Sequence, residues 1–232
     1  TAVITVDGAE LPRVKVTTKA DGSALVKFDL PPTITVGEGL LSILVEDGGI
    51  TESISKSIPI IQKKLSLAFF PEGGKMVAGL PTRLYFEAKT LLGKPADVEG
   101  YLIDDLGNKI EKFSTYKNGL GRLEFTPATG RTYKAKISHP TTVTEQYALP
   151  LAEEKGCVLR SYDDLDGQEK ALRVAVRCSE PQKVVVVATL RENLFDMGVV
   201  EAGPTVPGVI YLKTKDSMMA TAAGVVRVTV FD

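Results

Sequence analysis

Gly130-Arg131-Thr132-Tyr133-Lys134-Ala135-Lys136-Ile137-Ser138 is the stretch that decides the fold of this 232-residue chain. Between Tyr133 and Ile137, apolar and charged side chains alternate, which is typical of a strand with one buried face. Two other stretches also consist of a glycine followed by a strand-like run. They begin at Gly39 and Gly224, so the three copies start 91 and 94 residues apart. A repeat of this length predicts one seven-stranded β-sandwich per copy.

The sequence around each copy repeats as well. Ser57–Ile60 and Ala148–Leu151 follow the first two copies and lie 91 residues apart. Short β-branched runs bounded by Gly, Pro, Asp and Asn occur along the whole chain, among them 13–18, 24–30, 40–46 and 183–190. The many glycines and prolines leave only 215–223 tolerant of a helical turn. We therefore predict an all-β chain of tandem immunoglobulin-like antiparallel β-sandwiches.

The repeat predicts one whole sandwich between two incomplete ones. Residues 1–62 form a sandwich that lacks its first strands, 63–152 a complete one, and 153–232 one that lacks its last strand. The chain opens inside a strand-like run, so we expect it to be a piece of a longer protein. In the complete copy, strands A to G are expected near 65–70, 82–90, 96–104, 108–114, 120–126, 131–138 and 143–151. The missing strands are explained by deletion or by exchange with another copy, and we favour deletion.

Composition excludes several classes of protein. The formal net charge is −1, whereas nucleic-acid binders usually carry a basic excess. No apolar run approaches the roughly 18 residues that a membrane span needs. One His, two Cys and no Trp offer few groups for catalysis, and we expect no enzyme activity, no cofactor and no metal.

The middle copy carries a set of motifs that points to a family. Phe69-Phe70-Pro71-Glu72-Gly73-Gly74 is followed by Val77–Leu80, Phe86–Ala88, Gly93–Pro95, Gly100–Asp104 and Gly107. This pattern resembles the macroglobulin-like domains of bacterial alpha-2-macroglobulin relatives. The resemblance implies tandem sandwiches in an extracytoplasmic protein, in the periplasm, on the outer surface or secreted. Some relatives trap proteases with a thioester in a Cys-Gly-Glu-Gln motif, which this chain lacks.

Turn chemistry accounts for the core of that motif. Pro71 fixes φ after strand A, while Gly73 and Gly74 tolerate positive φ, and Glu72 lies between them. No helix signal follows the glycines, so the block is not a phosphate loop. We interpret Pro71, Glu72, Gly73 and Gly74 as a structural turn rather than a ligand site.

The two cysteines are placed to meet. Their midpoint lies at Asp166-Gly167, and a hairpin around that turn would set Cys157 opposite Cys178 and Leu159 opposite Val176. The other face of the hairpin carries more polar pairs, so the cysteines are predicted on the buried face. Directly opposed residues have Cα atoms about 4.5–5.5 Å apart, within reach of a disulfide. Either a disulfide or two buried thiols fits this pattern, and metal binding lacks companion ligands.

Other reactive residues have plainer interpretations. His139 precedes a proline at the turn after strand F, and no second histidine exists to join it. Asp163, Asp164 and Asp166 form an acidic loop without the glutamate of an EF-hand, so a solvated turn is favoured over a Ca²⁺ site.

These features predict a non-catalytic structural and interaction module, a candidate scaffold of a protease inhibitor. Its partners would be the neighbouring domains of the parent chain, and proteases or surface proteins. The alternative is a carbohydrate- or surface-binding accessory sandwich of a larger receptor or enzyme. Aromatic residues make up only 6% of the chain, which gives sugar binding little support.

Overall fold

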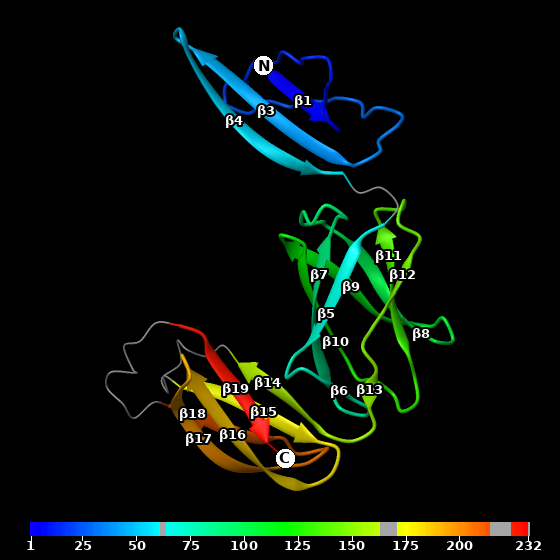
Figure 1. Ribbon diagram of the computed structural model, residues 1–232, viewed down its shortest axis with the longest axis vertical. Helices are drawn as coiled ribbons and strands as arrows, with labels where there is room; N and C mark the ends of the chain where they lie inside the picture. Colours follow the sequence, from blue (N-terminus) through cyan, green and yellow to red (C-terminus); the bar gives the residue numbers. More distant parts are fainter. Residues whose placement is uncertain (61–63, 163–170, 214–223, 232) are drawn as a thin grey trace.

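The computed structural model describes residues 1–60, 64–162, 171–213 and 224–231, which form three successive β-units along the long axis (Figure 1). The part of the chain so described contains strands and no helix, and so no helix that could cross a membrane. The stretch at 215–223 that tolerates a helical turn and the acidic loop at 163–166 lie outside these residues.

The second unit has every strand expected of a complete sandwich. They are β5 (Ser66–Pro71), β7 (Thr82–Lys89), β8 (Glu99–Asp104), β9 (Lys109–Lys117), β10 (Leu120–Phe125), β11 (Tyr133–His139) and β12 (Gln146–Ala148). They form one folded sheet in the order β12-β11-β8-β9-β10-β7-β5. The last strand is shorter than expected at both ends, and at its C-terminal end Pro150 has no N–H to continue the ladder.

The core of the second unit follows the predicted alternation. Tyr133, Ala135 and Ile137 of β11 are buried, whereas Lys134 and Lys136 between them are exposed. The inward side chains of β7 pack against them from the opposite layer. The folded sheet thus forms two layers that enclose one apolar core.

The third unit consists of two three-stranded sheets. One has the order β14 (Cys157–Tyr162), β15 (Leu172–Cys178), β18 (Gly208–Leu212). The other has the order β17 (Asn193–Ala202), β16 (Gln182–Leu190), β19 (Val226–Phe231). These are the A-B-E and D-C-F strands of an immunoglobulin-like antiparallel β-sandwich. Among the described residues, no strand pairs with the outer edge of β19.

The first unit is a single sheet, and two of the strands predicted for it were wrong. Its order is β2 (Ala9–Glu10), β1 (Ala2–Val6), β3 (Glu38–Asp47), β4 (Ile50–Pro59). Residues 13–18 and 24–30 are not strands, apart from one bridge between Val14 and Ala2. In the second unit the strand equivalent to 24–30 is β10, which pairs along its whole length with β7. The first unit has no described strand in the place of β7, so 24–30 has no partner.

The number of residues between the repeated glycine and the first inward side chain differs between the copies. The first inward side chain of the strand is the third residue after Gly130 but the second after Gly224. A shift of one residue turns every side chain of a strand to the other face. The glycine therefore marks the start of the strand correctly but not which residues it buries.

Candidate functional site: the junction of the second and third units

The Pro71–Gly74 motif lies where the second unit meets the third. Pro71 ends β5, and the Gly74 N–H donates to the Pro71 carbonyl at 2.8 Å. Gly73 and Gly74 have φ of 83° and 88°, the left-handed region that glycine adopts without strain. The turn projects Glu72 toward β14 of the third unit.

Glu72 bonds directly to the third unit. Its Oε1 accepts hydrogen bonds from Ser161 N at 2.8 Å and from Ser161 Oγ at 2.7 Å. Its Oε2 lies 3.4 Å from Nη1 of Arg83, and the glutamate side chain is only 9% exposed. The neighbouring Gly73 approaches so closely that a Cβ would lie 3.1 Å from Leu159 N. The motif predicted as a turn is thus also a contact between units.

A chain of charges continues from Glu72 across the junction. Arg83 Nε binds Glu124 Oε1 at 3.0 Å, and Arg160 Nη2 of β14 binds the same oxygen at 3.0 Å. Burial opposes the charge on Arg83, but bonds to Glu124 and Tyr85 and the charge of Glu72 raise its pKa. Burial likewise opposes ionisation of Glu124, but the two arginines lower its pKa. Arg83 and Glu124 therefore stay ionised at neutral pH.

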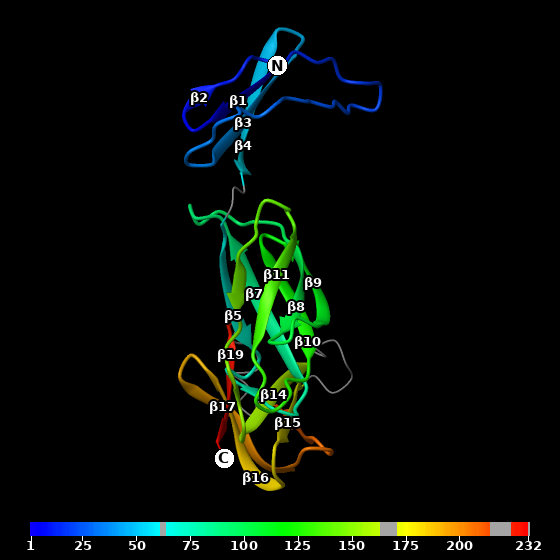
Figure 2. The ribbon, with the colours of Figure 1, turned by 90° about the vertical axis from the view of Figure 1, so that its right-hand side faces the viewer.

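An apolar contact lies beside the charges. Val77 and Leu80 of the second unit enclose Val158 of β14, and all three side chains are buried. Val158 belongs to the hairpin face predicted to be the more polar one, and the second unit supplies its cover. Next to it, β6 (Met76–Val77) pairs in parallel with β13 (Ala152–Glu153) (Figure 1). β13 leads into β14 of the third unit, which lies directly below the second unit (Figure 2).

The two cysteines meet within the third unit. β14 pairs with β15 in the predicted register, with Leu159 opposite Val176 and Cys157 opposite Cys178. The two sulfur atoms are bonded at 1.99 Å, and Cys178 is fully buried. The Gln182 amide donates to Cys157 Sγ at 3.0 Å, so the disulfide is also bonded to the opposite sheet.

The remaining candidates form no site within the described part of the chain. His139 is an exposed residue at the end of β11, opposite Glu99. No group of three or more His, Cys, Asp or Glu side chains placed to hold a metal ion occurs among the described residues.

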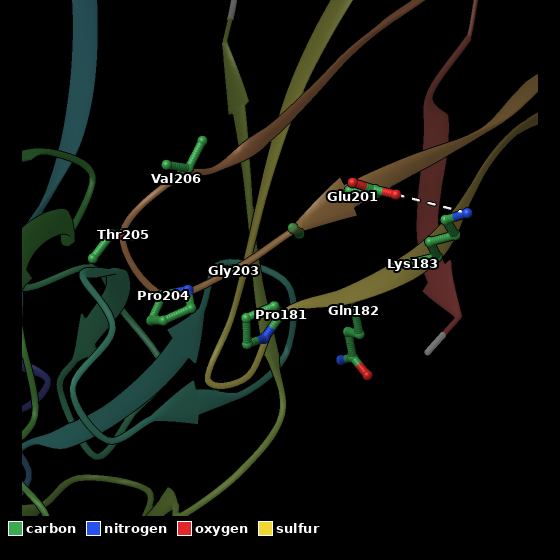
Figure 3. Close-up of a pocket in the computed structure, with 9 residues that line it drawn as sticks. Pro181, Gln182, Lys183, Glu201, Gly203, Pro204, Thr205 and Val206 are labelled. Carbon is green, nitrogen blue, oxygen red and sulfur yellow. Dashed lines mark ion pairs between the residues drawn. The ribbon is translucent and has the colours of Figure 1, made fainter.

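A separate hollow lies at one end of the third unit, between residues 181–183 at the start of β16 and residues 201–206 at and after the end of β17 (Figure 3). Its volume is about 550 Å³, and Lys183 Nζ and Glu201 Oε1 face each other across its rim at 3.6 Å. Neither segment carries an aromatic side chain that could stack on a sugar.

Sequence reasoning missed the docking role of Glu72. Pro71 and the two glycines suffice for a turn, so nothing marked the acidic residue between them as special. Its partner, Ser161, lies 89 residues away, and no local pattern joins the two.

Comparisons with known proteins give distant similarity. No protein-family model and no curated protein matches the chain. Solved structures that are similar include the Escherichia coli adhesin FdeC, at 14% identity over 76% of this chain with a TM-score of 0.31. Salmonella alpha-2-macroglobulin reacted with methylamine is 10% identical over 99%, with a TM-score of 0.30. A tetra-tandem repeat of a large adhesion protein is 13% identical over 93%, with a TM-score of 0.24. The chain spans 66%, 19% and 58% of those three chains, respectively.

Proposed function

We propose that this chain is a non-catalytic structural and interaction module of an extracytoplasmic protein of the alpha-2-macroglobulin type. The proposed units are 1–62, 63–152 and 153–232, and the second and third act as one rigid body. The observation that carries the proposal is the junction, where Ser161 of the third unit and Arg83 of the second hold the nearly buried carboxylate of Glu72.

Rigidity follows from the kinds of contact at the junction. A single exposed ion pair contributes about 0–1 kcal/mol, which would not fix an angle between units. Here a nearly buried carboxylate, an apolar cluster and a backbone pairing act together on the same short connection. Such a joint suits a shell or stalk that presents surfaces to other proteins.

The disulfide supports an extracytoplasmic location. Disulfides persist in oxidising compartments and are rare in the cytosol. Within the third unit, Cys157 is partly buried and Cys178 fully buried, and the two are bonded, as in a structural rather than a reactive pair. The carbohydrate-binding alternative gains no support from the hollow of Figure 3, whose lining residues present no aromatic surface.

Residual dipolar couplings test the rigid joint. In the unaltered protein, couplings from the second and third units should fit one alignment tensor. In Glu72→Ala, Ser161 loses its partner and Arg83 keeps only Glu124, at a cost of about 1–3 kcal/mol, and the two units should need separate tensors.

Glu111→Gln is the matched control, because Glu111 is exposed on β9 away from the junction. This variant should keep the single tensor. Independent tensors in the unaltered protein would show that the two units are not one body.

A further inference from the structure

The β17-β16-β19 sheet of the third unit has an apolar face on the side away from the core. Five side chains on this face are neighbours in the strand register: Val185 and Val187 of β16, Met197 and Val199 of β17, and Phe231 of β19. Met197, Val199 and Phe231 are 54%, 63% and 56% exposed. The core takes the alternate side chains of the same strands. We call these five residues the apolar face.

The second unit carries charged side chains in the same place. β8 and β11 correspond to β16 and β19 by their positions in the sheets. On the outward side of β11, Lys134 and Lys136 lie opposite Ile103 and Tyr101. Lys109 of β9 covers the ring of Tyr101, with Nζ 4.0 Å from its centre. Lysines thus keep this side of the second unit in water, whereas the centre of the apolar face carries no charge.

The exposure of the apolar face does not depend on a strand beyond β19. In the second unit the last strand, β12, pairs with the edge of β11. A further strand in the third unit would likewise extend the sheet at the edge of β19, and the outward sides of β16 and β17 would stay uncovered. Contiguous apolar patches are uncommon on monomeric proteins and often mark interaction surfaces.

Charges of opposite sign lie at opposite corners of the apolar face. Glu201 of β17 lies at one end, beside Lys183, with Nζ and Oε1 3.6 Å apart (Figure 3). Both of these side chains are largely exposed, so the pair is loose. Arg227 of β19 lies at the other end, opposite Thr189. Among the described residues, Arg227 has no hydrogen bond or ion pair.

We propose that a second copy of this chain packs on the apolar face, so that two modules form a symmetric dimer. A two-fold axis between the sheets, perpendicular to the line from Glu201 to Arg227, brings Glu201 of each copy to Arg227 of the other. Glu201 then lies between two cations, Lys183 of its own copy and Arg227 of the second. Glu124 has the same arrangement at the junction. The surface is thus complementary to itself in both apolarity and charge, as a two-fold interface requires.

The dimensions of the face set the strength of the dimer. Three strands about 4.8 Å apart and four rows of side chains about 6.7 Å apart make a face about 15 Å wide and 20 Å long. A standard interface buries about 800 Å² on each partner, which is more than this face supplies. We therefore expect a dimer that depends on concentration, with a dissociation constant of about 10–100 μM.

The dimer names a partner for the proposed interaction role and rests on that role. The two proposals fail separately, because the five residues of the apolar face and the residues that hold Glu72 are different. A monomer whose second and third units fit one alignment tensor would reject the dimer alone. A dimer whose units need separate tensors would reject the rigid joint alone.

Sedimentation equilibrium of the complete chain from about 5 to 500 μM tests the dimer, and the average mass should rise toward twice that of the monomer. Val199→Lys introduces the kind of residue that the second unit carries and should raise the dissociation constant at least about tenfold. Val209→Lys is the matched control, because Val209 is 44% exposed on β18 in the other sheet. This control should leave the dissociation constant unchanged.

A charge exchange tests the two-fold arrangement and serves also if Val199→Lys misfolds. Arg227→Glu and Glu201→Arg should each weaken the dimer at least about fivefold, because like charges then meet at both ends. The double variant should recover the original dissociation constant. A double variant as weak as the single ones would overturn this arrangement.

Three further results would overturn the proposal. The first is a monomer at every concentration up to about 500 μM. The second is a dimer that Val199→Lys and Val209→Lys weaken equally. The third is a dimer that persists on dilution and in Val199→Lys, which would mean that the incomplete units exchange strands instead.

Discussion

Asp104 shows how a single carboxylate holds a sandwich loop together. It lies at the end of β8 and accepts hydrogen bonds from Leu106 N, Asn108 N and the Asn108 amide at 2.8–3.0 Å. Arg131, just before β11, binds the same carboxylate. Although burial opposes ionisation, the bonds from Asn108 and Arg131 lower the pKa of Asp104 to about 2.

The first unit repeats this device with different partners. Asp7 directly follows β1 and accepts four backbone N–H groups of residues 35–38, which lead into β3. These bonds, from Val36 and Glu38 above all, hold the pKa of Asp7 well below its usual range. Asp104 thus joins the end of β8 to Arg131, just before β11. In the same way, Asp7 joins the end of β1 to the segment that leads into β3.

Stability at low pH should depend on Asp104. Its pKa is lower in the folded state than in the unfolded chain, about 3.9. Its contribution is therefore complete above about pH 4 and is lost as the pH falls toward about 2. Asp104→Asn should flatten the dependence of unfolding free energy on pH in this window. Urea unfolding at several pH values measures it.

Asp97→Asn is the control for that measurement, because Asp97 is exposed and accepts only one long hydrogen bond, from Thr115 Oγ1 at 3.4 Å. An equal flattening in both variants would show that Asp104 is not the group responsible.

At the scale of the element, two glycines leave space in the core of the second unit for aromatic rings from neighbouring strands. A Cβ on Gly121 of β10 would overlap the ring of Phe86, and one on Gly100 of β8 would lie 2.6 Å from the ring of Phe113. The two rings pack edge to face with centroids 5.1 Å apart at the centre of the core. Each glycine thus makes room for an aromatic side chain.

Gly121→Ala should therefore destabilise the second unit. The ring of Phe86 must move to accept the methyl group, and overpacking of this kind costs about 1–3 kcal/mol. Chemical denaturation followed by circular dichroism measures the loss. Gly203→Ala, where the nearest atoms lie at an ordinary 3.8 Å, should change the unfolding free energy by less than about 0.5 kcal/mol.

The hairpin of β14 and β15 should depend on its disulfide. The bond closes a loop of 21 residues, for which restriction of the unfolded chain gives about 3 kcal/mol. The double variant Cys157→Ser and Cys178→Ser should lose stability of that order. Intact mass after alkylation checks the bond itself, and two freely alkylated thiols in the folded, unreduced protein would contradict it.

Strands were predictable from the sequence wherever a strand-like local pattern also has a neighbouring strand to pair with. Alternation located β11, and the cysteine spacing predicted the register of β14 with β15. Residues 24–30 have the same strand-like pattern but are not a strand, because a strand also needs a neighbour. The junction was not predictable, since Glu72 and Ser161 are joined only when two units pack.

At the scale of the whole molecule, the two connections differ in strength. The second and third units share buried charges, an apolar cluster and a backbone pairing. Between the first and second, Lys94 and Glu38 form an ion pair at 3.5 Å whose glutamate side chain is 62% exposed. Such a pair contributes about 0–1 kcal/mol, so among the described residues the contact between the first two units is much weaker than the buried contacts between the second and third.

The unpaired segment of the first unit makes it the point where a protease should enter. Proteases bind their substrates as extended strands. Residues 24–30 are exposed except for the partly buried Val26 and Phe28, and they have no described partner strand to release first. Trypsin should therefore cut after Lys27 before it cuts after Lys134 or Lys136, which β8 and β12 hold on both sides. Timed digestion with mass spectrometry should show an early fragment that begins at Phe28, and Lys27→Gln should delay it. Early cuts within β11 would instead mean that the second unit opens first.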